Sequence, residues 1–222
     1  MSPFQSIFVP KAMKKLNLLL VEDEVMVREG FRAMLEREPF TTQVHEAGNG
    51  SETLTTLHSR AIDLILLDIR LKDIHGVELA RKIRTLFPDV KIIAVTGLDG
   101  SELILNLLKS GIHGFVQKMN GFDQIRKAIH AVIDDGQYYP ERVVNTIKQN
   151  LDHWESPPPV QLTDKELELL KAIVAGMTTK EIADKLQLAM RTVETNRVRL
   201  MKKTNTFNTA GLIAYGFRNG II

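Results

Sequence analysis

The chain has 222 residues, with 29 basic and 27 acidic side chains and a formal net charge of +2 at pH 7. At about 100–200 residues per domain, this length predicts one large domain or two small ones. The content of hydrophobic (44%) and charged (25%) residues excludes a disordered or collagen-like chain. The chain has no cysteine, which excludes a disulfide scaffold and a thiolate metal site. The small net charge gives no sign of a nucleic-acid partner in the chain as a whole.

The sequence gives no indication of a membrane partner. It contains no apolar run approaching the roughly 18 residues that a membrane span requires. Residues 1–14 lack a basic stretch before their apolar side chains, and Pro10 interrupts them, so we expect an N-terminal extension rather than a signal peptide. We therefore expect a cytoplasmic protein.

Short apolar runs alternate with amphipathic stretches as far as residue 135. Nearly continuous apolar runs of this length are typical of parallel strands buried on both faces, and we expect strands at 16–21, 42–47, 62–67, 90–95 and 113–116. The first helix is expected to bury the stripe Val27, Gly30, Phe31, Met34 and Leu35. Further helices are expected at 51–60, 76–86, 101–110 and 122–134. Five strand–helix repeats predict an α/β fold with a doubly wound, five-stranded parallel sheet.

The pattern changes after residue 136. One helix is expected over 141–151, and the prolines at 157–159 cannot continue a helix, so they indicate a linker. Beyond it, Thr163 and Glu166 form a capping-box signature that begins a helix, and further helices are expected at 179–186, 191–204 and 209–218. We therefore divide the chain into an extension (1–14), an α/β domain (15–136), a linker (137–160) and a small all-α domain (161–222).

Polar side chains with a common chemistry follow the expected strands. Ligands of open α/β sheets bind beyond the carboxyl ends of the strands, and that rim collects Glu22, Asp23, Asp68, Thr96 and Lys118. Carboxylates are hard oxygen ligands for Mg²⁺, and a carboxylate can also act as a nucleophile toward a phosphoryl group. Lysine and hydroxyl groups can neutralise phosphoryl oxygens. The set therefore predicts phosphoryl transfer to a carboxylate.

These residues resemble the receiver domain of two-component response regulators over 16–135. The resemblance rests on Glu22-Asp23, Asp68 within LILLDIRL, Thr96-Gly97, and Lys118 three residues after Phe115. It implies that Asp68 accepts a phosphoryl group from a sensor histidine kinase. It also implies a role for each of the other motif residues: Glu22, Asp23, Asp68 and the Arg70 backbone carbonyl hold Mg²⁺, Lys118 and Thr96 bind the phosphoryl oxygens, and Phe115 is the switch aromatic.

Two positions depart from that family, and two other enzyme-like interpretations have weak support. Lys72 replaces the usual proline four residues after the phosphoacceptor, and Gln117 precedes the lysine. A phosphatase of the haloacid dehalogenase type would have a second acid two residues after Asp68, and this chain has Arg70 there. A dinucleotide site would have glycines where Glu22 and its acidic neighbours stand.

Residues 161–222 differ in charge from the rest of the chain. They contain ten basic and six acidic side chains, a net +4, whereas the remainder, with 19 basic and 21 acidic side chains, carries −2. A helical wheel of 191–204 puts Val193, Arg197, Leu200, Met201 and Thr204 on one side, and we expect the Arg197 guanidinium to extend outward from it. The opposite side presents Arg191, Thr195, Val198, Arg199 and Lys202, a face that suits a major groove.

The segment LTDKELELLKAIVAGMTTKEIADKLQLAMRTVETNRVRLMKKTN is similar throughout to the LuxR-type helix-turn-helix domain. By position, the resemblance implies base contacts from Glu194, Thr195 and Val198. It implies DNA backbone contacts from Lys180, Arg191, Asn196, Arg199 and Lys202. With the receiver resemblance, it identifies the chain as a member of the NarL/FixJ class of response regulators.

The resemblances imply a transcription regulator rather than an enzyme, with self-catalysed phosphoryl acceptance and hydrolysis as its only chemistry. Phosphorylation of Asp68 with Mg²⁺ would promote a homodimer and binding to double-stranded promoter DNA. An alternative stays open: a DNA-binding regulator independent of phosphorylation, whose receiver is a protein-interaction module.

Overall fold

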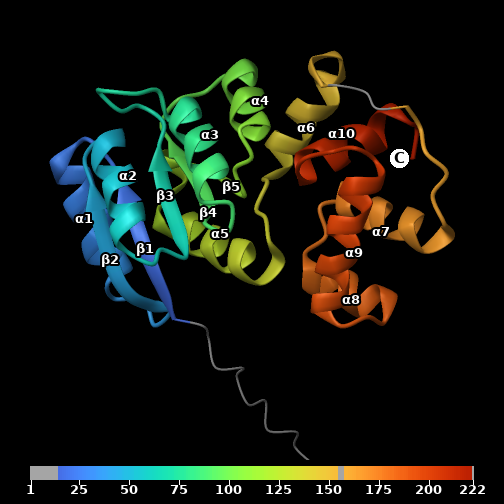
Figure 1. Cartoon of the computed structure of the whole chain (residues 1–222), viewed down its shortest axis with the longest axis horizontal. Helices are drawn as coiled ribbons and strands as arrows, with labels where there is room; N and C mark the ends of the chain where they lie inside the picture. The colour runs from blue at the N-terminus through green and yellow to red at the C-terminus, as the bar shows by residue number, and fades with distance from the viewer. Residues whose placement is uncertain (1–14, 155–157, 222) are drawn as a thin grey trace, which may run out of the picture.

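The computed structural model describes residues 15–154 and 158–221, so the N-terminal extension expected at 1–14 and part of the proline linker lie outside the described residues. The chain forms an α/β part followed by a helical part (Figure 1). The five strands are β1 (Leu16–Val21), β2 (Thr41–Ala47), β3 (Leu64–Asp68), β4 (Lys91–Thr96) and β5 (Gly114–Gln117). All paired strands run parallel, in the order β2-β1-β3-β4-β5, which confirms the predicted doubly wound sheet.

Helices cover both faces of this sheet. They are α1 (Val25–Leu35), α2 (Gly50–Ser59), α3 (Gly76–Leu86), α4 (Ser101–Lys109) and α5 (Phe122–Asp135). Because successive strand residues point to opposite faces, Leu19 and Ile65 pack with α2, α3 and α4, whereas Leu18 and Leu64 pack with α1 and α5. Burial on both faces explains the nearly continuous apolar strands of the sequence.

The prediction for the buried stripe of α1 was wrong in part. Leu35 is buried, but Gly30 and Met34 are exposed. Arg28 and Arg32, on the side of the helix opposite to Gly30, both pair with Glu46 of the edge strand β2, at 3.3 Å and 2.6 Å. The inward side of α1 is therefore rotated from the expected stripe, away from Gly30 and Met34 and toward Leu35 and Arg28.

The helical part begins with the capping box predicted from the sequence. Thr163 and Glu166 exchange the two bonds of that motif at the start of α7 (Asp164–Val174), and Thr178 and Glu181 repeat it at the start of α8 (Thr179–Leu186). The remaining helices are α9 (Met190–Lys203) and α10 (Thr209–Arg218). The element ends for which the sequence predicts a residue range agree with the structure to within two residues.

The structure corrects one expectation for α9. Val193, Leu200 and Thr204 are buried, as the wheel predicts. The Arg197 side chain is also buried, at 6% exposure, and its Nη2 donates a hydrogen bond to Thr179 Oγ1 at 3.0 Å. The guanidinium therefore does not extend outward; it lies inside and joins α9 to the first turn of α8.

Helix α6 (Glu141–Gln149) lies between the two parts of the chain (Figure 1). Its buried Val143 and Ile147 belong to the same apolar cluster as the α4 residues and the α7–α10 core. Asn208, at the start of α10, donates from Nδ2 to the carbonyl oxygen of Leu108 in α4 at 2.7 Å. The two parts are thus in direct contact. Within the described ranges, no helix is long and apolar enough to span a bilayer.

Gly76 fixes the loop that follows β3, which gives a test of the fold. A Cβ at Gly76 would lie 2.6 Å from Ile69 Cα, so something must shift. We expect Gly76→Ala to lower the free energy of unfolding by about 1–3 kcal/mol, as overpacking does. Gly30→Ala is the matched control, since nothing lies within 4 Å of its Cβ position in α1. It should raise stability by about 0.5–1 kcal/mol. Urea unfolding measures both, and equal effects would contradict this account.

Candidate functional site

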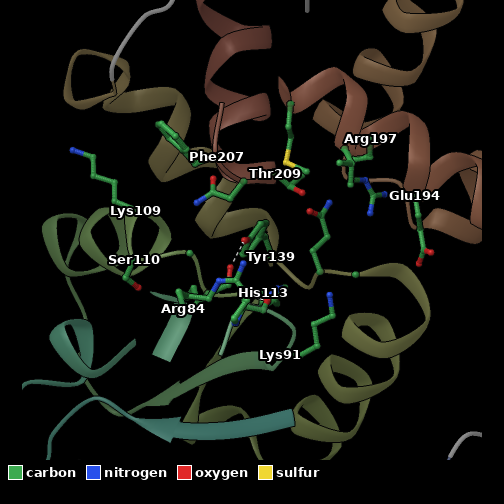
Figure 2. A pocket seen from close by; sticks show the side chains of 18 of the residues that line it. Arg84, Lys91, Lys109, Ser110, His113, Tyr139, Glu194, Arg197, Phe207 and Thr209 are labelled. Carbon is green, nitrogen blue, oxygen red and sulfur yellow. Dashed lines mark hydrogen bonds between the residues drawn. The ribbon is translucent and has the colours of Figure 1, made fainter. Parts of the chain in front are cut away.

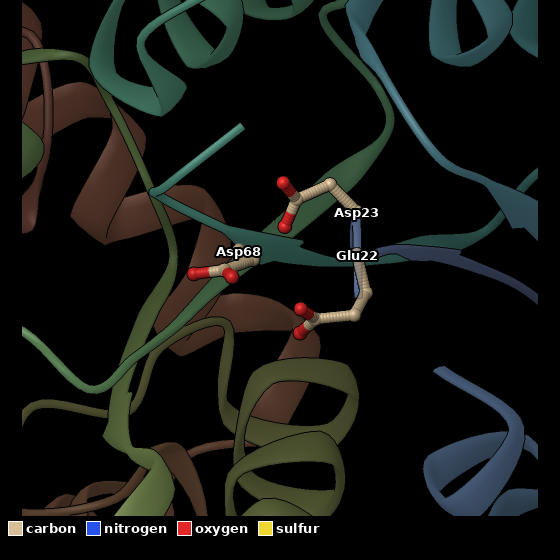
Figure 3. A group of neighbouring side chains, drawn as sticks. All are labelled: Glu22, Asp23 and Asp68. Atoms are coloured by element: carbon tan, nitrogen blue, oxygen red, sulfur yellow. The ribbon is translucent and has the colours of Figure 1, made fainter. Parts of the chain in front are cut away.

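Three carboxylates gather beyond the ends of neighbouring strands. Glu22 and Asp23 follow β1, Asp68 ends β3, and the carboxylates extend into one region (Figure 3). One oxygen from each lies within 4.8 Å of the others. Glu22 and Asp68 are buried and Asp23 is half-buried. The parallel topology therefore brings together acids that are 46 positions apart in the sequence.

Lys118 offsets part of the charge of these acids. It follows β5, and its Nζ lies 2.6 Å from Glu22 Oε2 and 2.8 Å from Asp68 Oδ2. Burial, together with the charge of Asp68, raises the pKa of Glu22 although Lys118 opposes this. The two carboxylates raise the pKa of Lys118 against the effect of its own burial, so it is held as a cation.

The two oxygens of Asp68 have different partners. Oδ1 accepts hydrogen bonds from the backbone N–H groups of Ile69 and Arg70, at 2.6 Å and 3.2 Å. Oδ2 accepts from Lys118. The carboxylate is therefore fixed in orientation beside an open hollow of about 360 Å³, which is lined by Glu22, Asp23, Glu24, Asp68, Arg70, Leu71, Lys72 and Lys118.

The donor set fits a divalent cation. Three carboxylates with neighbouring oxygens, half enclosed at the edge of a hollow, are hard ligands of the kind that Mg²⁺ prefers, and the hollow leaves room for water. Lys72, which stands at the position of the family's proline, lies with its Nζ 3.6 Å from Asp23 Oδ2. Its side chain is 81% exposed, so this pair is weak and can be displaced.

Two of the expected site residues lie outside the hollow. Thr96 ends β4 and is fully buried, and its hydroxyl accepts a hydrogen bond from the Leu98 N–H at 3.0 Å. Phe115 lies in β5 beside Ala94 of β4 and is buried in the cluster that faces α3 and α4. In this structure, neither side chain lines the hollow that holds the carboxylates.

Arg28 is a residue of the site that sequence reasoning missed. Its Nη1 donates to the backbone carbonyl oxygen of Glu22 at 2.6 Å, and its Nε lies 3.3 Å from Glu46. It thus ties the loop carrying the acids to β2. No local motif marks it, because the contact depends on the direction in which α1 leaves that loop.

The second group of expected site residues lies on the helical part. The expected DNA face of α9 is exposed, comprising Arg191, Thr195, Val198, Arg199 and Lys202. Glu194 is exposed and Asn196 half-buried, and Lys180 is exposed on α8. Glu194 and Val198 also line a cavity shared with Arg84 and Lys91 of the α/β part. Part of the face is therefore turned toward that part of the chain.

Two family models match these two parts. Residues 18–130 match the response regulator receiver domain. Residues 160–215 match the bacterial regulatory proteins of the luxR family. The first match contains the acids and Lys118, and the second contains α7–α9 and most of α10.

Relatives match this chain over nearly its whole length and over nearly the whole of their own. A protein of Pseudomonas aeruginosa named as a transcriptional regulator is 32% identical over 206 residues, covering 93% of this chain and 99% of its own. The response regulator UvrY of Escherichia coli is 28% identical over 208 residues, covering 93% and 95%.

A solved structure shares the fold. RcsB from Salmonella enterica serovar Typhimurium, bound to a promoter with phosphomimetic BeF3−, matches 91% of this chain and 98% of its own, with a TM-score of 0.58 and 23% identity. Three observations point to the same family. They are the acidic site at the strand ends of the α/β part, the LuxR-type helical part, and a relative matched along nearly the full length. The chain is a transcriptional regulator that belongs to the NarL/FixJ family of response regulators, with a receiver domain and a LuxR-type DNA-binding domain.

Proposed function

We propose that Asp68 accepts a phosphoryl group from a sensor histidine kinase with Mg²⁺ present, and that this controls binding to promoter DNA as a homodimer. The receiver would occupy 15–136 and the DNA-binding domain 161–222, joined by 137–160. The observation that carries the proposal is the Asp68 carboxylate, fixed at a strand end between Lys118 and the backbone of Ile69, and facing an open hollow.

The transfer uses groups that are already in place. An Asp68 oxygen attacks phosphorus and forms the P–O bond, while the P–N bond to the kinase histidine breaks and its imidazole keeps the bonding electrons. A cation held by Glu22, Asp23, Asp68 and the Arg70 carbonyl would neutralise charge on the phosphoryl oxygens. Lys118, now 2.8 Å from Asp68, would pair with those oxygens.

The added charge supplies the switch. Phosphorylation adds about −1.5 to −2 at pH 7 beside buried carboxylates. We expect Lys118 to move toward the phosphoryl group and Thr96 to exchange its bond with Leu98 N–H for one with a phosphoryl oxygen. Phe115 would turn into the space that Thr96 leaves. These changes act on β4 and β5, which lead into the helices facing the helical part.

In the proposed mechanism, DNA binding also requires α9 to move away from the receiver. Glu194 and Val198, which are expected to contact bases, line the cavity between the two parts of the chain. A major groove could not reach both while that arrangement holds. We therefore propose that phosphorylation separates α9 from the receiver, after which two copies bind inverted half-sites.

One observation favours a second candidate function. Lys72 lies beside Asp23, one of the expected metal ligands, and is a cation at the mouth of the hollow. If it weakened metal binding enough, the chain would bind DNA without phosphorylation, and its receiver would serve as a protein-interaction module. Selection of DNA from a random pool, with and without beryllofluoride, separates the two: recovery of the same site at equal affinity would favour the second.

Asp68→Asn tests phosphoryl acceptance. The amide cannot form the acyl phosphate, so we expect the variant to incorporate no label from acetyl phosphate, whereas the native chain is labelled with Mg²⁺ and loses labelling on chelation. Asp134→Asn is the control, because Asp134 is an exposed α5 carboxylate. Phosphate-affinity electrophoresis reads the result. Labelling of Asp68→Asn equal to that of the native chain would refute the proposal.

The exposed face of α9 allows a test of DNA contacts. Removing one phosphate contact with Arg199→Ala or Lys202→Ala should weaken binding on all sequences and reduce the salt dependence of log K by about 1. Lys127 is an exposed residue of α5, and Lys127→Ala should leave both the affinity and its salt dependence unchanged. Fluorescence anisotropy over a range of salt concentrations measures the slope. An unchanged slope in both α9 variants would contradict the assigned face.

A further inference from the structure

A second hollow lies between the two parts of the chain, away from Asp68. It has a volume of about 590 Å³, within the range of about 300–1,000 Å³ for small-molecule sites. Its walls come from the end of α3, the start of β4, the turn after α4, the segment after α5, and α9 (Figure 2). The proposed phosphorylation chemistry uses none of these residues.

The cavity is strongly cationic. Among the described residues that line it, Glu194 is the one acid. Four residues carry positive charge: Arg84, Lys91, Lys109 and Arg197. Lys91 and Arg197 extend into the same space from opposite walls (Figure 2). Burial lowers the pKa of Lys91 and of Arg84. Cations gathered in a partly buried space oppose one another, so the arrangement favours an anion among them.

Lys91 has donors available to such an anion, whereas Arg84 already donates from Nη1 to the Pro88 carbonyl oxygen. Within the described ranges, the Lys91 ammonium makes no hydrogen bond or ion pair. His113 Nδ1 accepts from the Ile92 N–H at 3.1 Å, and burial lowers the pKa of His113 to about 3. The ring is therefore neutral, and its remaining proton is on Nε2. Arg197 is held in position by its bond to Thr179.

The lining also has an apolar side. Phe207 lines the cavity and is 87% exposed, so its ring is available for packing. The Tyr139 hydroxyl already donates to the Ile112 carbonyl oxygen at 2.7 Å, so this residue offers its ring rather than a donor. The cavity therefore has cations in its lining and an exposed aromatic ring, Phe207. Such a lining suits a ligand that carries both phosphate groups and a flat ring.

We propose that this cavity binds a small organic phosphate of the nucleotide type, with its phosphate groups among Lys91, Arg84 and Arg197 and its base against Phe207. Because the receiver supplies Lys91 and Arg84 and the DNA-binding domain supplies Arg197 and Phe207, the ligand bridges the two domains. This site is separate from the Asp68 centre, and its occupation needs no phosphorylation.

Calorimetric titration of the full chain with ADP tests the proposal. Metal-free buffer prevents ADP from binding through a cation at Asp68, whose surroundings are acidic and repel phosphate. We expect one ADP per chain, and adenosine binding at least about 10-fold more weakly because it lacks the charged contacts. Lys91→Gln with Arg84→Gln should weaken ADP binding by about 10-fold or more, with Arg84→Gln alone used if the pair is unfolded by circular dichroism.

Two controls locate the ligand. Lys127→Gln removes an exposed cation that does not line the cavity, and Arg199→Gln with Lys202→Gln removes two cations of the α9 face, so all of these should keep native ADP affinity. Loss of binding in the α9 variant but not in the cavity variant would place the anion on the DNA face and overturn the proposal. Absence of ADP binding to the native chain would overturn it as well.

Discussion

The contact of one lysine with two buried carboxylates is the interaction on which the rest of this structure depends. Glu22 and Asp68 are 2% and 5% exposed, and two carboxylates so enclosed repel one another. Lys118 joins both, reaching across 96 positions of sequence to Glu22 and 50 to Asp68. A buried charge without a partner would cost several kcal/mol, so about that much is at stake in the position of Lys118. In the proposed function, a phosphoryl group on Asp68 would therefore draw Lys118 toward it.

The two domains are joined by opposite kinds of contact. Apolar packing through Val143 and Ile147 of α6 and the bond from Asn208 to Leu108 hold them together. Across the cavity, by contrast, Arg197 of α9 opposes Lys91 of the receiver, whereas Glu194 of the same helix attracts it. An arrangement balanced in this way can be shifted by a modest input, which is what a switch requires. The near-neutral net charge of the chain conceals this, because an acidic receiver and a basic DNA-binding domain cancel.

Much of this architecture follows from the sequence because it depends on local patterns. Strand apolarity, the capping box at Thr163 and the acids after β1 and β3 are all local, and topology alone then brings Glu22, Asp68 and Lys118 together. Residue contacts set by the relative orientation of helices could not be predicted. Arg197 was expected to extend outward, yet the angle between α8 and α9 puts it against Thr179. The buried stripe of α1 was expected to include Gly30 and Met34, but the helix is turned so that both are exposed while Arg28 and Arg32 lie beside Glu46.

The central claim is that the charge at Asp68 sets the contact between the receiver and α9. Because the chain has no native cysteine, Lys127→Cys on α5 and Lys185→Cys on α8 can carry the sole pair of spin labels, on exposed positions of two helices that are in contact. Double electron–electron resonance then measures the distance between the domains directly. The account predicts one short distance in the unmodified chain and a longer, broader distribution once beryllofluoride and Mg²⁺ are bound. An unchanged distribution, with beryllofluoride shown by fluorine NMR to be bound at Asp68, would contradict it.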